Sequence, residues 1–278
     1  MTKIACLWCA TSGVAPLLVQ SLRSAKAVGI EPRSMFVLAM DEELPPILRR
    51  EVVDANFLRF PAPTYQLVGL GSLPRFTEYG TPEFRKLSFI RYIAVQYLLN
   101  SGFDNVLYID ADILFVANPL EDLIFASPYA ADALLTQNDS RNWNHERAAF
   151  RFGKGEAIDH EIICCGFNLW RNTPQHSHII QGLLNAGASL EWTQSCQQVF
   201  NRVKGNFADA IQLLPACKYP NGACFVEMGA AIFDCAPFIF HANWVVGLQD
   251  KLLLMSEFSA GRQPAVTRTA LASHQGGR

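Results

Sequence analysis

Short apolar runs alternate with segments of helical periodicity along most of this chain. Strong strand patterns occupy residues 4–9, 34–40, 106–116 and 161–171, with weaker ones at 57–60, 131–136 and 238–240. Runs that are apolar on both faces are typical of strands covered by helices on either side. Alternation of such strands with helices favours parallel connections. We therefore expect an α/β fold whose central sheet is mixed, mainly parallel and flanked by helices.

The helical segments have recognisable starts and ends. They cover the region between Pro16 and Gly29, residues 43–54, a long segment from Thr81-Pro82-Glu83 to Gly102, a segment starting at Asn118-Pro119, a segment from Thr173-Pro174 to about Ala186, and residues 193–203. Proline near the first turn and glycine after the last are ordinary helix boundaries. From Leu87 to Leu99 the pattern is apolar almost all round, which indicates a core helix. Arg91 is the exception, so its guanidinium must reach either solvent or an anion.

Two connections are long enough to suggest a role in binding. Residues 61–82 are rich in Pro, Gly and Tyr, as in lids and substrate loops. The polar, aromatic and basic insertion at 141–155 is either an acceptor-contacting loop or a plain surface loop. No linker interrupts the pattern, so we expect one domain over 1–258, and a loose tail over 259–278 where apolar periodicity ends.

Composition and charge narrow the function classes. With 278 residues, 50% hydrophobic and 17% charged, the chain can bury a large core and is not disordered. A net charge of −2 argues against a broad basic surface for nucleic acid, which leaves small ligands or another protein as partners. No window reaches about 18 uninterrupted apolar residues, so no membrane span is expected. The first expected strand begins after three residues, so no signal peptide is expected.

The eight cysteines favour a reduced, cytoplasmic setting. Adjacent Cys164 and Cys165 diverge, and Cys6 and Cys9 lie within the first expected strand, so neither pair suits a disulfide. Cys6-x-x-Cys9 has the spacing of half a zinc site or of a redox motif. No second such pair follows, so buried structural thiols are the favoured interpretation.

Asp110 and Asp112 are the most informative polar residues because they lie in the apolar run 106–116. In an extended segment, residues two apart point the same way, so both carboxylates can face one place. Like charges aimed together need a cation or a shared proton. A pair that simply caps a strand in solvent is the alternative. A second alternative is the aspartate motif of the haloacid-dehalogenase phosphatases. In those proteins, unlike here, the motif lies near the N-terminus and is followed by smaller residues.

Ligands of open α/β sheets gather beyond the carboxyl ends of the strands, where Asp110, Asp112 and His241 are expected. Two carboxylates and an imidazole suit Mn²⁺ or Mg²⁺, and the imidazole favours Mn²⁺. Arg91 and Lys251 can then neutralise a diphosphate. The pattern predicts a metal-diphosphate site.

Four segments, taken in this order, resemble the nucleotide-diphospho-sugar transferases. They are LYIDADILFVANPLEDL at 107–123, CCGFNLWRNTP at 164–174, QQVFN at 197–201 and HANWVVGLQDK at 241–251. The resemblance covers residues 4–256 and looks closest to the retaining plant-type and protist-type α-glycosyltransferases, with the glycogenin and lipopolysaccharide galactosyltransferase families as more distant relatives. It implies a Rossmann-like GT-A fold that binds a nucleotide sugar, most often a UDP-sugar, through Mn²⁺.

The resemblance also implies roles for individual residues. The metal ligands would be Asp110, Asp112 and His241; the donor nucleotide would contact Ala10, Thr11, Asp41, Arg91, Ala111, Gly247 and Lys251; and Gln198 would lie on the sugar face opposite the acceptor. Asp41 can equally be helix-start charge, since it precedes an expected helix.

Two departures from the family pattern qualify the expected activity. Gln197 stands where the family usually has Asp, and Cys164 where it usually has Asn. The resemblance implies transfer of a sugar to an acceptor hydroxyl of a glycan, protein or small molecule, with retention of configuration. With Gln197 at the obvious position, no carboxylate can be assigned as covalent nucleophile, so a front-face route is the hypothesis. The alternative is a catalytically silent nucleotide-sugar-binding or scaffold protein of the same fold.

Overall fold

A seven-stranded sheet forms the centre of the molecule. The computed structural model describes residues 2–51, 54–70, 77, 80–139, 163–262 and 264. The strands of the sheet are β1 (Ile4–Ala10), β2 (Met35–Ala39), β3 (Asn56–Leu58), β4 (Asn105–Ile109), β6 (Leu134–Asn138), β7 (Ile163–Arg171) and β8 (Ile211–Leu214), in the order β3-β2-β1-β4-β7-β6-β8. Within it, β7 runs antiparallel to both neighbours and every other pairing is parallel. The predicted mixed, mainly parallel sheet is confirmed.

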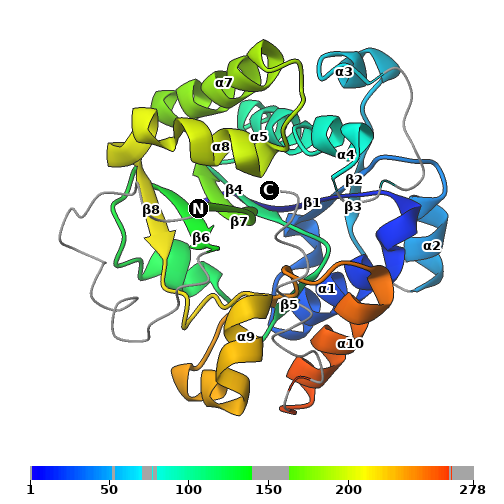
Figure 1. Ribbon diagram of the computed structural model, residues 1–278, viewed down its shortest axis with the longest axis vertical. Coiled ribbons are helices and arrows are strands. Elements are labelled where there is room, and N and C mark those ends of the chain that lie inside the picture. The colour runs from blue at the N-terminus through cyan, green and yellow to red at the C-terminus, as the bar shows by residue number, and fades with distance from the viewer. Residues whose placement is uncertain are drawn as a thin grey trace.

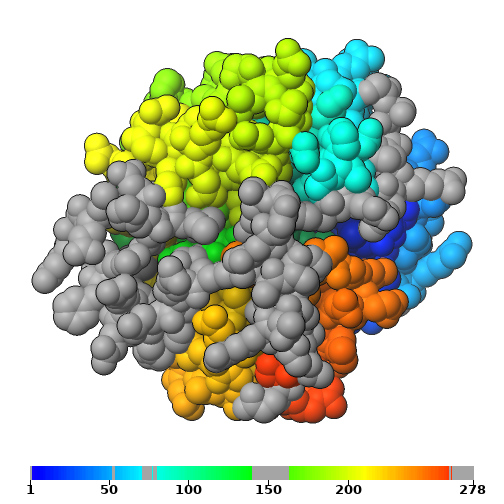
Figure 2. Space-filling model, in the orientation of Figure 1, coloured from blue at the N-terminus to red at the C-terminus, as the bar shows by residue number. Residues whose placement is uncertain are grey.

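Helices cover both faces of this sheet (Figure 1). They are α1 (Ala15–Ala27), α2 (Leu44–Arg50), α3 (Ala62–Gln66), α4 (Pro82–Leu87), α5 (Ile90–Asn100), α7 (Pro174–Ser189), α8 (Cys196–Val203), α9 (Gly222–Met228) and α10 (Leu248–Ser259). On one face α5, α7 and α8 pack a core against the sheet, and on the other α1 and α2 form a second core. In Figure 2, α7 and α8 form the upper part of the visible face, and α9 and α10 lie below. Among the helices described, none has the length and hydrophobicity needed to cross a lipid bilayer.

The central apolar run is not one strand as predicted. Strand β4 ends at Ile109, a turn follows in which the Ile113 amide donates to the Asp110 carbonyl at 3.3 Å, and β5 (Ile113–Phe115) leaves the main sheet. Strand β5 pairs antiparallel with β9 (Ile239–His241) in a separate two-stranded sheet. A third core, built mainly by α9 and α10, packs against this small sheet. The two carboxylates therefore lie on a turn between two sheets, and the predicted extended conformation of residues 106–116 was wrong.

Other expectations differ from the structure in smaller ways. The long helix from Thr81 is divided into α4 and α5 at Ser88 and Phe89. The segment starting at Asn118 forms only a short π-helical turn, Glu121–Phe125. Strand β8 and helix α9 were not predicted from the sequence. The insertion at 141–155 lies outside the described residues, as does nearly all of the chain beyond Arg262.

The cysteines form no disulfide. All eight are free. Cys6 and Cys9 lie on β1, and burial raises the pKa of each thiol to about 12, which keeps both protonated at neutral pH. Cys6 is buried and Cys9 is partly buried against the core, which fits the interpretation of this pair as packing residues.

His176, in the first turn of α7, makes stability depend on pH. Its Nδ1 accepts from the Arg171 amide at 2.7 Å and its Nε2 donates to the Asp132 carbonyl at 2.9 Å, an arrangement that requires the neutral ring. Burial lowers the pKa of His176 to about 4. Below pH 6.5 the unfolded chain therefore binds a proton that the folded protein does not bind until pH 4. The free energy of unfolding falls as pH drops through this window.

We expect this residue to account for about 2 kcal/mol of the stability lost between pH 7 and pH 5, which is the part of the full pKa difference (about 3 kcal/mol) that falls within this pH interval. His176→Gln should be less stable at pH 7 but should lose less stability on acidification. Urea unfolding of both proteins at pH 7 and pH 5 measures the difference. Equal losses in the two proteins would contradict this account.

Candidate functional site

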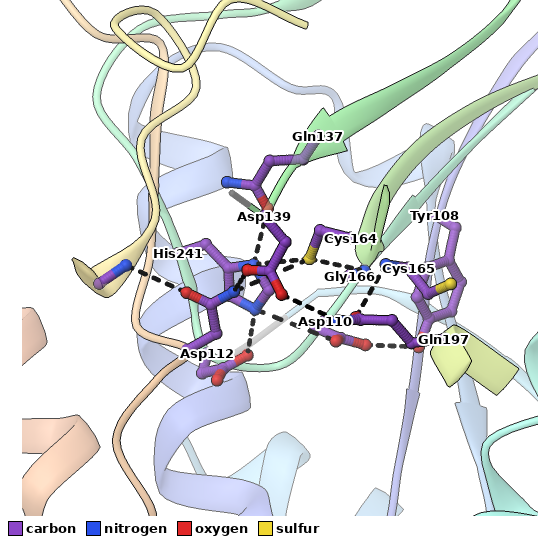
Figure 3. A network of polar contacts seen from close by, with 12 residues as sticks. Tyr108, Asp110, Asp112, Gln137, Asp139, Cys164, Cys165, Gly166, Gln197 and His241 are labelled. Atoms are coloured by element: carbon purple, nitrogen blue, oxygen red, sulfur yellow. Dashed lines mark hydrogen bonds and ion pairs between the residues drawn. The ribbon is translucent and has the colours of Figure 1, made fainter. Parts of the chain in front are cut away.

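Three potential metal ligands converge beyond the carboxyl end of β4 (Figure 3). Asp110 and Asp112 come from the turn between β4 and β5, and His241 ends β9. The His241 Nε2 atom lies 3.2 Å from Asp112 Oδ1 and 4.0 Å from Asp110 Oδ2. One ligand atom from each residue lies within 4.8 Å of the others. The structure thus brings together the three residues that the sequence singled out.

Gln137 fixes which nitrogen of His241 faces the carboxylates. The Gln137 amide Nε2 donates to the carbonyls of Tyr219 (2.9 Å) and Pro220 (3.2 Å), so its Oε1 faces His241 Nδ1 at 2.7 Å. Nδ1 then carries the proton, and the lone pair of Nε2 points to Asp110 and Asp112. Three electron-rich atoms that face one another are stabilised by a divalent cation. The residues present fit such an ion.

A permanent cation contacts the other oxygen of each carboxylate. Arg91, in the first turn of α5, lies 3.3 Å from Asp110 Oδ1, which also accepts from the Tyr108 hydroxyl at 2.8 Å. Lys251, in the first turn of α10, contacts Asp112 Oδ2. Arg91 therefore binds the anion and does not extend to solvent, which resolves the choice left open by the sequence.

The ion pairs shift the pKa values of Asp112, Lys251 and Arg91 toward their charged forms. Burial by itself raises the pKa of Asp112, but the Lys251 ammonium outweighs burial and holds that pKa well below its usual range. Burial would lower the pKa of Lys251 and of Arg91, but Asp112 and Asp110 respectively raise them above their ordinary values. Asp112, Lys251 and Arg91 are therefore charged at neutral pH.

The start of α10 offers a place for an anion beside Lys251. Gly247 is the N-cap of this twelve-residue helix and has a φ of +105°, which side-chain-bearing residues rarely adopt. The free amides of a helix N-terminus and the nearby ammonium together suit a phosphate group.

The loop after β1 is joined to the end of β2. Asp41 accepts from the Ser12 amide at 2.6 Å through Oδ2, and from the amides of Glu43 and Leu44 through Oδ1. This supports the helix-start interpretation of Asp41, since its carboxylate satisfies amides at the start of α2. Ala10, the last residue of β1, and Thr11, the first residue of this loop, are buried next to the end of β4. Ala111 lies between the two aspartates in the turn.

The structure does not bring Gln198 to this site. Its side chain accepts from the Ser195 amide at 2.8 Å and closes a capping box at the exposed start of α8. The neighbouring Gln197 faces the site instead: its Oε1 accepts from the Cys165 amide at 3.2 Å and its Nε2 donates to Asp139 at 2.8 Å. The Ser195-x-x-Gln198 spacing is a readable capping signal that assigns Gln198 to the helix start.

Two further residues were not identified from the sequence. Gln137 and Asp139 follow the strand expected at 131–136, and both are buried next to the site. Cys164, at the start of β7, places its Sγ 3.6 Å from His241 Nδ1.

Oxygen ligands, one imidazole and surrounding cations can hold a divalent ion together with an anionic ligand.

Comparisons with known proteins agree with this chemistry. The model of the family described as nucleotide-diphospho-sugar transferase matches residues 32–255. No curated protein sequence matches the chain. Among solved structures, the galactosyltransferase LgtC in complex with donor and acceptor sugar analogues is similar with a TM-score of 0.57 and 15% identity over 95% of this chain and 98% of LgtC.

Two other solved structures share the fold. Mouse xyloside xylosyltransferase 1, in its apo form, has a TM-score of 0.55 and 11% identity, covering 87% of this chain and 98% of its own. Core-mannan synthase A from Aspergillus fumigatus, in its Mn/GDP form, has a TM-score of 0.50 and 8% identity, covering 77% and 73%.

Proposed function

This chain belongs to the nucleotide-diphospho-sugar transferase family and has the GT-A glycosyltransferase fold, and on that basis we propose that it transfers a sugar from a UDP-sugar to an acceptor hydroxyl in a metal-dependent reaction. The observation that carries the proposal is the convergence of Asp110, Asp112 and His241, with Gln137 directing the unprotonated nitrogen of His241 toward the carboxylates. Residues 1–258 would form the catalytic domain, and the acceptor would be a glycan, a protein or a small molecule.

Asp110, Asp112 and His241 would hold Mn²⁺ or Mg²⁺, with Mn²⁺ favoured by the imidazole ligand. When bound, the ion supplies Lewis-acid stabilisation of the diphosphate leaving group. Support for manganese comes from the Mn/GDP form of the similar core-mannan synthase A.

The protein's own cations would stabilise the charge that develops as the sugar departs. Arg91 and Lys251 are already within contact distance of the carboxylates, so no reorganisation is needed to place positive charge there. The start of α10 at Gly247 would bind phosphate oxygens through its free amides. Ala10, Thr11 and Asp41 would contact the nucleoside from the adjacent strand ends.

Retention of anomeric configuration is also part of the proposal. Gln197, which contacts Cys165 and Asp139, would lie near the sugar, and an amide is a poor covalent nucleophile, so the departing phosphate would assist deprotonation of the acceptor on the same face. We assign to Gln197 the sugar-side role that the family pattern suggested for Gln198. An active-site glutamine-to-glutamate variant of LgtC is among the similar solved structures.

The test is release of nucleotide from a panel of UDP-sugars and GDP-sugars with and without Mn²⁺. Release from at least one donor that depends on Mn²⁺ supports the proposal, and NMR of the product should show the same anomeric configuration as the donor. Tight, Mn²⁺-dependent UDP binding without nucleotide release from any donor, with any acceptor tested, would favour a catalytically silent nucleotide-sugar-binding protein. An inverted linkage would contradict retention alone.

Gly166 on β7 provides a steric test of the same site. Its carbonyl accepts from the Asp110 amide at 2.7 Å, and a Cβ at this position would lie 2.7 Å from Asp110 Oδ2 and even closer to the His241 ring. Gly166→Ala should therefore weaken Mn²⁺-dependent UDP binding by about 10-fold to 100-fold, as displaced supporting groups at metal sites commonly do.

Isothermal titration with UDP and Mn²⁺ measures this effect. Gly205→Ala is the matched control, because a Cβ there meets no atom within 4 Å. Normal Mn²⁺-dependent UDP binding by the Gly166 variant would show that the positions of Asp110 and His241 do not determine metal binding.

A further inference from the structure

The carboxylate of Asp139 connects segments that are far apart in the sequence. Asp139 follows β6 and is 2% exposed. Its Oδ1 accepts from Asn243 Nδ2 at 2.6 Å and from Trp244 Nε1 at 2.8 Å, and its Oδ2 accepts from Gln197 Nε2 at 2.8 Å. One side chain thus joins the start of α8 to the segment between His241 and α10.

This network contacts the metal-ligand cluster. Asn243 Nδ2 lies 3.8 Å from Cys164 Sγ, which in turn lies 3.6 Å from His241 Nδ1. Figure 3 shows Asp139, Cys164 and Gln197 grouped with His241 and Asp110. Any group attached to a diphosphate at Asp110 and Asp112 would therefore have this network as a close neighbour.

Strand order gives the direction in which a nucleotide sugar would extend. The loops of β1 and β2, with Thr11 and Asp41, lie on one side of β4, and β7 and β6 lie on the other. Strand β6 is antiparallel to β7, which is antiparallel to β4, so β6 and β4 end at the same edge. With the nucleoside beside β1 and β2 and the diphosphate beyond β4, the sugar would lie beside Gln197 and Asp139.

Asp139 also determines how the Gln197 amide is oriented. An ionised carboxylate only accepts hydrogen bonds, so it selects the NH₂ end of the amide and leaves Oε1 for the Cys165 amide. An amide has two donor hydrogens and two acceptor lone pairs, and these two contacts use one of each. One donor and one acceptor of Gln197, held in a fixed orientation, remain for sugar hydroxyls.

We propose that Asp139 is the positioning residue of the sugar subsite: it fixes Gln197, Asn243 and Trp244 so that the hydroxyl-bearing ring of the donor is recognised beside the metal-diphosphate site. This inference rests on the proposed function. The role proposed for Asp139 concerns only the sugar, so the effect of replacing Asp139 can be distinguished from a loss of nucleotide binding.

The test compares UDP with the best UDP-sugar of the wild-type panel, both in saturating Mn²⁺. In Asp139→Asn, an amide that can donate replaces a group that only accepts, which disturbs the orientation of Gln197. Affinity for the UDP-sugar should fall at least about 10-fold, while affinity for UDP should stay within about 3-fold of wild type. Titration calorimetry measures both constants, and thermal unfolding checks that the variant is folded.

Gln197→Glu provides a second variant that does not alter Asp139, since its carboxylate would face that of Asp139 and remove the N–H donor. It should show the same split between UDP and UDP-sugar. Gln181→Glu, on the exposed side of α7, is the matched control and should change neither affinity. Equal losses of affinity for UDP and UDP-sugar in the Asp139 and Gln197 variants would show that Asp139 has only a structural role. Unchanged affinities in these variants would place the sugar elsewhere. If wild type binds no UDP with Mn²⁺, the proposed function itself fails.

Discussion

Replacing Asp110 or Asp112 by Asn should abolish Mn²⁺-dependent nucleotide binding and reduce sugar transfer at least about 100-fold, the usual effect of losing one preorganised electrostatic group. Both carboxylates direct one oxygen to His241 Nε2, and an amide there offers a weaker, uncharged ligand. The fold should persist because the turn is held by backbone hydrogen bonds from the Asp110 amide to Gly166 and from the Ile113 amide to Asp110.

The measurements are UDP titration with and without Mn²⁺, nucleotide release, and thermal unfolding. Asp122→Asn is a suitable control because Asp122 is also paired with a lysine, Lys218, at 3.3 Å, but away from this site. That variant should lose stability and keep Mn²⁺-dependent UDP binding. If the Asp110 and Asp112 variants bind UDP with metal as wild type does, the metal site has been wrongly assigned.

Replacing Lys251 by Met should have opposite effects on metal and nucleotide. The two carboxylates are already balanced by Arg91 and Lys251, so a divalent ion alone enters a cluster with no excess negative charge. Removal of the Lys251 charge should raise the affinity for Mn²⁺ alone by about 10-fold. This change corresponds to about 1.5 kcal/mol of repulsion between the Lys251 ammonium and the divalent ion at the dielectric constant of water. With Mn²⁺ saturating, the affinity for UDP should fall by about 10-fold because the diphosphate loses a cation.

Electron paramagnetic resonance of Mn²⁺ measures the first quantity and calorimetry with UDP the second. Lys218→Met, which removes the ammonium of a different lysine–aspartate pair, should change neither. A Lys251 variant that binds Mn²⁺ alone no better than wild type would show that the ammonium does not oppose the ion. Wild-type protein should also bind Mn²⁺ more tightly when UDP is present, because the diphosphate restores negative charge and the coupling is reciprocal.

The sequence predicted the features that depend on local pattern. Apolar runs and helix boundaries identified β1, β2, β7 and α7 within a few residues, since burial and capping leave periodic signals. The departure of β5 from the main sheet was not predictable because its pairing with β9 joins residues distant in sequence. The apolar run continues through the turn, so hydrophobicity alone gave no sign of the division.

The same distinction applies to the site. Asp110, Asp112 and His241 stood out because charged or titratable groups follow apolar segments. Gln137 and Asp139 carried no such signal, since the importance of each comes from partners that only the fold brings near, namely His241 and Gln197. The choice between Gln197 and Gln198 depended on helix capping, which a family pattern does not reveal.

The pairing of β5 with β9 affects when, during folding, this protein becomes able to bind metal and nucleotide. Asp110 and Asp112 lie between the main sheet and β5, whereas His241 arrives on β9, near the end of the described chain. Contacts of such sequence separation form late, since the entropy of closing a long loop opposes them. The main sheet can be native before any metal site exists. Recovery of nucleotide binding during refolding would therefore report the docking of β9, whereas recovery of the far-ultraviolet signal would report the sheet.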